Sequence, residues 1–133
     1  MNFFDAKLTK EGDNYFVHIE GASFKVDSKK TEILKEKGIE NKDIILGVRP
    51  DHIKLSDGQE GIKAKLKVKE MMGAEMHLHL ERGEYKDIIA IVPTSSLSAD
   101  QKESLKEDKE VSFAFEGKFM HLFDKETEEN LIY

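Results

Sequence analysis

The amino-acid sequence predicts a mainly β protein with one short helix, folded as a small barrel or barrel-like sandwich. Three observations support this prediction. The dominant hydrophobic period is two residues, which is the period of a strand with one buried face. The alternating segments are short and recur at regular intervals between turn residues. A single stretch, residues 28–37, has the spacing of a helix instead.

The N-terminal part of the chain predicts three strands followed by this helix. The strands are expected over residues 4–9, 15–20 and 23–26. The turn at Gly12 predicts a hairpin between the first two. Asp27 or Ser28 can accept hydrogen bonds from the first turn of the helix, and Gly38 supplies the left-handed residue that commonly ends one. The apolar stripe of the helix is narrow, so we expect it to lie on the surface of the sheet.

The remainder of the chain returns to strand patterns. Strands are expected over residues 43–48, 53–55, 62–68, 76–80, 88–92, 111–115 and 119–123, with residues 131–133 closing the chain. Proline ends two of them, at Pro50 and Pro93, because it lacks the amide donor that a sheet requires. Gly73 and Gly83 mark turns. The polar stretch 98–108 predicts a loop with one helical turn.

Composition bounds the class of protein. With 133 residues, 38% of them hydrophobic, the chain can build one compact core, so we expect a single domain over residues 1–133 with a sub-barrel boundary near residues 56–61. The formal net charge of −6 disfavours nucleic acid as a partner. The absence of cysteine excludes disulfides and thiolate metal ligands. No secretory signal or membrane-spanning apolar run is visible, so a cytoplasmic location is expected.

The sequence offers little catalytic chemistry. Its glycines are dispersed and form neither of the common phosphate-binding loops, so we expect no bound ATP or other cofactor in this chain alone. No nucleophile motif or paired carboxylates stand out, and no catalytic residue is predicted. Arg49, which precedes a proline at a strand end, is expected to act as a structural clamp on a carboxylate or on backbone carbonyls.

His77 and His79 are the best metal-like pair, because residues two apart on a strand point to one face. His121 on another strand can join them. The alternative, which we favour, is that the pair lies on the polar face of its strand and binds no metal. The opposite face would then be formed by Met76, Leu78 and Leu80.

Two further groups of residues are given structural roles. The first is a group of alternating phenylalanines near the C-terminus, which could form a platform for stacking nucleic-acid bases. No basic groove surrounds these residues, so core packing is expected. Its members are Phe113, Phe115, Phe119 and Phe123. The second is expected to form a solvated strand face that discourages edge pairing. Its members are Lys63, Lys65, Lys67, Lys69 and Glu70.

Four segments together resemble one family. Residues 47–53 (GVRPDHI) resemble the strand-and-turn signature in the C-terminal domain of ATPase subunits of maltose-type sugar and glycerol-phosphate importers. Residues 72–75 (MGAE) resemble the turn between two long strands of that domain, and residues 120–127 (MHLFDKET) its closing segment. The opening residues 1–4 (MNFF) resemble the sequence that follows the nucleotide-binding half. Their order and spacing fit the family over essentially the whole chain.

The resemblance implies a transport-associated OB fold of the TOBE type, separated from the ATP-hydrolysing half of the subunit. It implies a regulatory domain that forms a homodimer in the full-length subunit, reaches membrane permease subunits through the missing ATPase half and, in some members, receives a cytosolic regulatory protein. It also implies a location at the inner face of the cell membrane. The full-length subunit would be a transport ATPase, and this fragment no enzyme. The alternative function is a small-ligand sensor for an oxyanion or a sugar.

The motifs supply candidates for structural and interface roles, and no catalytic, cofactor-binding or metal-ligating residue is predicted. The candidates are Arg49, Pro50, Asp51, His52, Gly73, Glu75, His121, Phe123 and Asp124.

Overall fold

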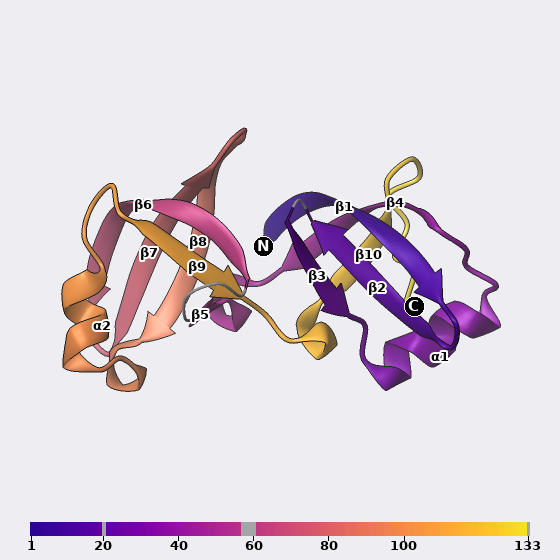
Figure 1. The fold of residues 1–133 in the computed structure, drawn as a ribbon, viewed down its shortest axis with the longest axis horizontal. Coiled ribbons are helices and arrows are strands. Elements are labelled where there is room, and N and C mark those ends of the chain that lie inside the picture. Colours follow the sequence, from indigo (N-terminus) through magenta and orange to yellow (C-terminus); the bar gives the residue numbers. More distant parts are fainter. Residues whose placement is uncertain (20, 57–60, 133) are drawn as a thin grey trace. The chain divides into compact units, whose positions relative to one another are not determined.

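The computed structural model describes residues 1–19, 21–56 and 61–132 (Figure 1). The chain divides into two compact units, each with its own five-stranded sheet. Unit 1 comprises Met1, Phe3–Val48 and Phe115–Tyr133, and unit 2 comprises Asn2 and Arg49–Ala114. The mainly β class is confirmed. The boundary expected near residues 56–61 includes residues 57–60, which lie outside the described residues, and it stays a prediction.

Unit 1 contains a sheet with the strand order β10-β4-β1-β2-β3. Its elements are β1 (Asn2–Glu11), β2 (Asn14–Ile19), β3 (Ala22–Lys25), α1 (Ser28–Glu36), β4 (Lys42–Val48), the 3-10 helix η3 (Gly117–Phe119) and β10 (His121–Asp124). β1 and β2 form the expected antiparallel hairpin, with Leu8 opposite Val17. β10 pairs antiparallel with β4, with Leu122 opposite Leu46.

The core of unit 1 follows from alternation along its strands. In β1, Phe4, Ala6 and Leu8 are buried, and the residues between them are exposed. Tyr15 is fully buried and donates a hydrogen bond from its hydroxyl to the Ile39 carbonyl at 2.6 Å. Burial, followed by the charge of Glu40, raises the pKa of Tyr15 because both disfavour a phenolate.

Helix α1 occupies the predicted stretch and buries Thr31 and Leu34. Asp27 is its N-cap residue by position, but its side chain makes no capping hydrogen bond. Gly38 has a φ of 66°, the left-handed conformation expected after the helix.

Unit 2 contains a sheet with the strand order β5-β9-β6-β7-β8. Its elements are the 3-10 helix η1 (Pro50–His52), β5 (Lys54–Ser56), β6 (Ile62–Met72), β7 (Glu75–Arg82), β8 (Tyr85–Pro93), the 3-10 helix η2 (Thr94–Ser96), α2 (Ala99–Ser104) and β9 (Glu110–Ala114). Strands β6, β7 and β8 form an antiparallel meander, with β7 in the middle. The predicted turns at Gly73 and Gly83 both have positive φ, 67° and 54°.

The path of β6 corrects the predicted alternation. Val68 was expected on the buried face with Leu66, but it is 50% exposed. The register with β7 shifts between Leu66 and Val68, as a β-bulge requires, and the extra residue moves Val68 to the other face. Lys69 therefore takes the inward phase, and its Nζ donates to the Leu105 carbonyl at 2.9 Å. The remaining lysines of the predicted charged face stay half-exposed beside carboxylates: Lys63 beside Glu110, and Lys65 and Lys67 beside Asp108.

Helix α2 is a second departure, because the sequence predicts one helix and only a helical turn within this loop. A capping box supports it: Gln101 N donates to Ser98 Oγ at 3.1 Å, and Ser98 N donates to Gln101 Oε1 at 2.9 Å. The two reciprocal hydrogen bonds satisfy the amides of Ser98 and Gln101, and they support a helix of six residues, five of which are polar. In the described part of the chain no helix is long and apolar enough to cross a membrane.

Candidate interaction surface

The sheet of unit 1 has one face that points away from its core, called here the outer face. In β1 the outer face carries Phe3, Asp5 and Lys7, which are all exposed. Because neighbouring strands continue the same alternation, this face has an apolar end around Phe3 and a polar end around Lys7. The two ends form two distinct parts of one surface.

The apolar end is a patch formed by Met1, Phe3, Ile45, Gly47 and Phe123, called here the apolar patch. Phe123 lies opposite Ile45 in the β10–β4 register. The Phe3 and Phe123 rings meet edge to face, with centroids 6.3 Å apart. Phe3 and Met1 remain 54% and 48% exposed. A partner that covers such a half-exposed apolar side chain removes apolar surface from water, which lowers the free energy.

Gly47 allows these side chains to gather. A Cβ at this position would lie 2.6 Å from Met1 Sδ and 3.2 Å from a ring carbon of Phe123. Because Gly47 has no Cβ, both groups can lie directly over β4 without displacing one another. Beside them, a hollow of about 400 Å³ is lined by Phe3, Ile45, Phe123 and Glu128.

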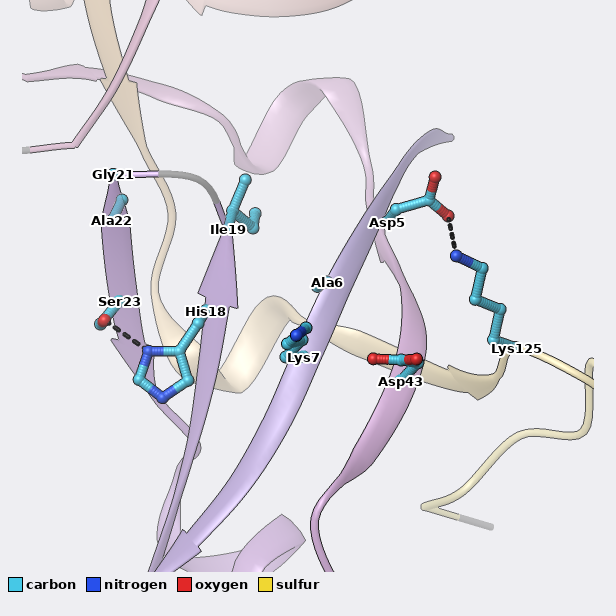
Figure 2. A pocket seen from close by; sticks show the side chains of 10 residues that line it. All are labelled: Asp5, Ala6, Lys7, His18, Ile19, Gly21, Ala22, Ser23, Asp43 and Lys125. Carbon is cyan, nitrogen blue, oxygen red and sulfur yellow. Dashed lines mark hydrogen bonds and ion pairs between the residues drawn. The ribbon is translucent and has the colours of Figure 1, made fainter.

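The polar end is an open groove of about 620 Å³ (Figure 2). Lys125 reaches across it to Asp5, with Nζ and Oδ1 3.6 Å apart. His18 is held on both sides: its Nδ1 lies 2.7 Å from Ser23 Oγ, and its Nε2 lies 2.7 Å from Thr9 Oγ1. The groove is lined by Asp5, Ala6, Lys7, His18, Ile19, Gly21, Ala22, Ser23, Asp43 and Lys125. Acidic and basic side chains are thus mixed along it.

Asp124 fixes the chain directly after Phe123. It is 9% exposed, forms an ion pair with Lys42 and accepts hydrogen bonds from the amides of Glu126 (2.8 Å) and Thr127 (3.0 Å). The hydrogen bond from Lys42 and those from the two amides lower the pKa of Asp124 to about 2, because they stabilise the carboxylate. Beyond the turn, Leu131 N donates to the Leu122 carbonyl at 2.8 Å, so Leu131 lies beside β10.

Of the nine predicted interface residues, the structure gathers three in unit 1. His121 and Phe123 point to the outer face from β10, and Asp124 anchors the following turn. Phe123 was expected in the core with the other phenylalanines, and this is corrected. Leu122 and Asp124 occupy the buried phase of β10, so Phe123 faces outward and is half-buried. Phe119 is half-buried as well.

Phe113 and Phe115 are buried as predicted. Phe115 also stacks on Phe24, with ring centroids 4.4 Å apart.

The other six predicted residues belong to unit 2. The 3-10 helix η1 is formed by Pro50, Asp51 and His52, and Arg49 precedes it. The Arg49 carbonyl accepts a hydrogen bond from His52 N at 3.0 Å. The clamp expected of Arg49 is not formed within the described ranges: its side chain is exposed and makes no hydrogen bond or ion pair there.

Gly73 lies in the β6–β7 turn and Glu75 begins β7, where its Oε2 is 3.5 Å from His77 Nε2. His77 and His79 lie on the polar face of β7, as favoured by the sequence, with Met76, Leu78 and Leu80 buried on the other. Among the described residues, no group of three or more potential ligands is suited to a metal ion.

Sequence reasoning missed Met1, Phe3, Ile45 and Gly47 as parts of the surface. The signal was present in β1, where Phe3 is the one large apolar residue on a phase otherwise formed by Asp5 and Lys7. An apolar residue among the outward-facing polar residues of a strand indicates either a β-bulge or a surface that contacts a partner.

Comparisons with known proteins match this chain over almost its whole length. The family model described as the MalK OB fold domain matches residues 1–53, and that of the TOBE domain matches residues 46–123, more than half of the chain. The oligosaccharides import ATP-binding protein MsmX of Bacillus subtilis (strain 168) is 33% identical over 96% of this chain. The trehalose/maltose import ATP-binding protein MalK of Thermococcus litoralis is 28% identical over 96% of it. The chain spans 33% of the length of each.

Among solved structures, the cytoplasmic molybdate-binding protein ModG superposes with a TM-score of 0.65 at 14% identity, covering 91% of this chain and 94% of that one. At this identity the likeness concerns the fold.

Proposed function

Because the chain belongs to the TOBE domain family, we propose that it is the regulatory domain of the ATP-binding subunit of a sugar or glycerol-phosphate ABC importer. Both relatives named above are sugar-import ATP-binding proteins, which supports the sugar class. The domain has no catalytic activity of its own in this proposal. It mediates contacts between subunits in the cytoplasm, and the complete subunit hydrolyses ATP and contacts the membrane permease.

The apolar patch is the observation that carries the proposal. Its two aromatic rings and Met1 form an exposed apolar centre next to a charged groove, which is the anatomy of a protein interface with an apolar core and a polar rim. We assign this surface to contact with a second copy of the chain. In a twofold dimer the same patch lies on both sides of the contact, so apolar side chains cover apolar side chains. A cytosolic regulatory protein would bind elsewhere on the dimer.

Sedimentation of the chain and of the complete subunit over a range of concentrations tests this function. Self-association is expected in both, and Phe3→Ser should weaken it about tenfold or more, because burying such a side chain contributes about 1.5–3 kcal/mol. Met71→Ser is the matched control, since Met71 is 60% exposed but lies in unit 2. Monomers at every concentration, or equal association of Phe3→Ser and the unsubstituted protein, would contradict the proposal.

A small-ligand sensor is the second candidate, and the polar groove is the observation that favours it. Lys7 and Lys125 supply cationic groups for an oxyanion, and Asp5 and Asp43 supply acceptors for sugar hydroxyls. Calorimetry with molybdate, sulfate, phosphate and simple sugars separates the candidates. Micromolar binding of one of these, lost in Lys7→Ala, would support the sensor, and no binding would leave the dimer contact as the function.

A further inference from the structure

Unit 2 carries a histidine held between two carboxylates on the polar face of its sheet. His79 lies on β7, the middle strand of the meander. Its Nδ1 is 3.0 Å from Asp87 Oδ1 on β8, and its Nε2 is 2.6 Å from Glu70 Oε1 on β6. A carboxylate accepts hydrogen bonds, so both contacts are favourable together only when both ring nitrogens carry a proton. The geometry is that of an imidazolium bridging two anions.

The β-bulge in β6 creates this arrangement. His79 is directly opposite Val68 on β6 and Ile89 on β8. Glu70 and Asp87 are each two residues away from those partners, so they are diagonal neighbours on the same face. Without the register shift after Leu66, Glu70 would point to the opposite face of the sheet. The irregular strand therefore delivers one of the two carboxylates.

We propose that doubly protonated His79 is a proton-controlled clasp that holds both flanking strands, β6 and β8, to β7. Loss of one proton leaves a neutral imidazole with a single donor and a bare nitrogen lone pair facing a carboxylate. One of the two cross-strand contacts is then lost. β8 is at an edge of the sheet, and in the described part of the chain β7 is the strand that it pairs with.

The charged surroundings favour the protonated form. The hydrogen bond to Asp87 raises the pKa of His79, partial burial opposes this, and Glu70 raises the pKa further. The other titratable groups on this face of β7 are Glu75, His77 and Glu81. His77 lies 3.5 Å from the Glu75 carboxylate, and Glu81 is on the same face. The side chains around the clasp are therefore mainly acidic. On β6, Lys67 lies within the bulge and Lys65 precedes it, and both are paired with Asp108.

The direction of the pH effect follows from the raised pKa. The clasp contributes its full stability below the ordinary histidine pKa of 6.5, where the unfolded chain is protonated as well. The contribution is lost as the pH rises through the higher pKa of the folded protein. The flanking strands are therefore held more tightly in mildly acidic than in mildly alkaline solution.

Nuclear magnetic resonance of the histidine side chains tests the clasp. In the unsubstituted chain, the imidazole of His79 should titrate above the ordinary histidine pKa of 6.5, with both ring N–H groups detected below its midpoint. Glu70→Gln and Asp87→Asn should each move the His79 midpoint downward, because each removes one anion and keeps the shape. His77→Gln is the matched control and should leave the His79 midpoint in place.

Amide hydrogen exchange supplies the structural readout. After correction for intrinsic rates, the protection of β8 should fall between pH 6 and pH 8.5, and this fall should be absent in His79→Gln. A His79 midpoint at or below the ordinary pKa of 6.5, or the same pH-dependent fall in His79→Gln, would overturn the proposal. If His79→Gln fails to fold, the His79 midpoints measured in Glu70→Gln and Asp87→Asn decide the proposal.

Discussion

At the scale of single residues, Asp124 stabilises the end of β10 through three partners. It neutralises Lys42 and accepts two hydrogen bonds from the turn that follows it. An aspartate that performs two tasks can be dissected by two substitutions. Asparagine keeps an oxygen for the turn amides but loses the charge, and alanine loses both.

We expect Asp124→Asn to lower the free energy of unfolding of unit 1, and Asp124→Ala to lower it further. The pKa is about 2 in the folded protein against an ordinary 3.8, so the ionic contribution is present above about 3.8 and lost as the pH falls through about 2. Amide exchange of β4 and β10 between pH 2 and pH 5 measures this loss. The steep pH dependence should be missing in Asp124→Asn, and its persistence there would assign it to another carboxyl.

At the scale of elements, η3 depends on a close approach between two backbones. A Cβ at Gly117 would lie 2.2 Å from the Lys25 carbonyl oxygen and 3.2 Å from Asp27 N. Lys30 then ties α1 to the same region, donating to the carbonyls of Lys118 (2.5 Å) and Met120 (2.6 Å). Glycine is required here by space and not by dihedral angle, since no positive φ occurs at this position.

Gly117→Ala is therefore expected to destabilise unit 1 by about 1–3 kcal/mol, the usual cost of overpacking against groups that cannot move freely. Chemical denaturation followed by circular dichroism measures the change. Lys118→Ala, at the next and exposed position, is the matched control and should stay within about 0.5 kcal/mol. Equal stability of the two variants would show that β3 shifts to accommodate the methyl group.

The strands could be predicted from the sequence because apolar and polar residues alternate along a strand as its buried and exposed positions do. Each of β1 to β10 overlaps a predicted strand. The phase was less predictable. In β6 the bulge after Leu66 reverses it without any glycine or proline to mark the place, and in β10 both Leu122 and Phe123 are apolar, so either can be the buried one. Pairing partners decide these cases, and they are absent from a single sequence.

The interface candidates show the same limit. The sequence supplies the motif residues of β10 as candidates, but Phe3 and Ile45 come from strands that only the sheet order brings beside Phe123. The side chain of Arg49 was expected to clamp a neighbour because of its place before a proline. No spacing in the sequence reveals whether such an acceptor lies within reach.

At the scale of the whole molecule, two units each have a core of their own. Leu46 is fully buried in unit 1, and Leu78 is fully buried in unit 2. Separate cores allow separate loss of structure, because a cavity in one removes packing from that core alone.

Leu46→Ala and Leu78→Ala are expected to cost about 2–5 kcal/mol each, within the unit that contains the substitution. Residue-resolved hydrogen exchange should show lowered protection in β1, β2 and β4 for the first variant and in β6, β7 and β8 for the second. Loss of protection spread evenly over both sheets in either variant would mean that the chain unfolds as one cooperative body, as a single domain would.

The order of the chain gives this division a consequence for biosynthesis. Unit 2 is continuous from Arg49 to Ala114, apart from Asn2, but unit 1 is completed by the later segment that contains β10. On the ribosome, the first strands of unit 1 emerge early and must wait, with an edge of β4 unpaired, while all of unit 2 is translated. The nascent chain is therefore exposed to premature pairing along β4 for the whole of that interval, and it is at this stage that a chaperone would protect it.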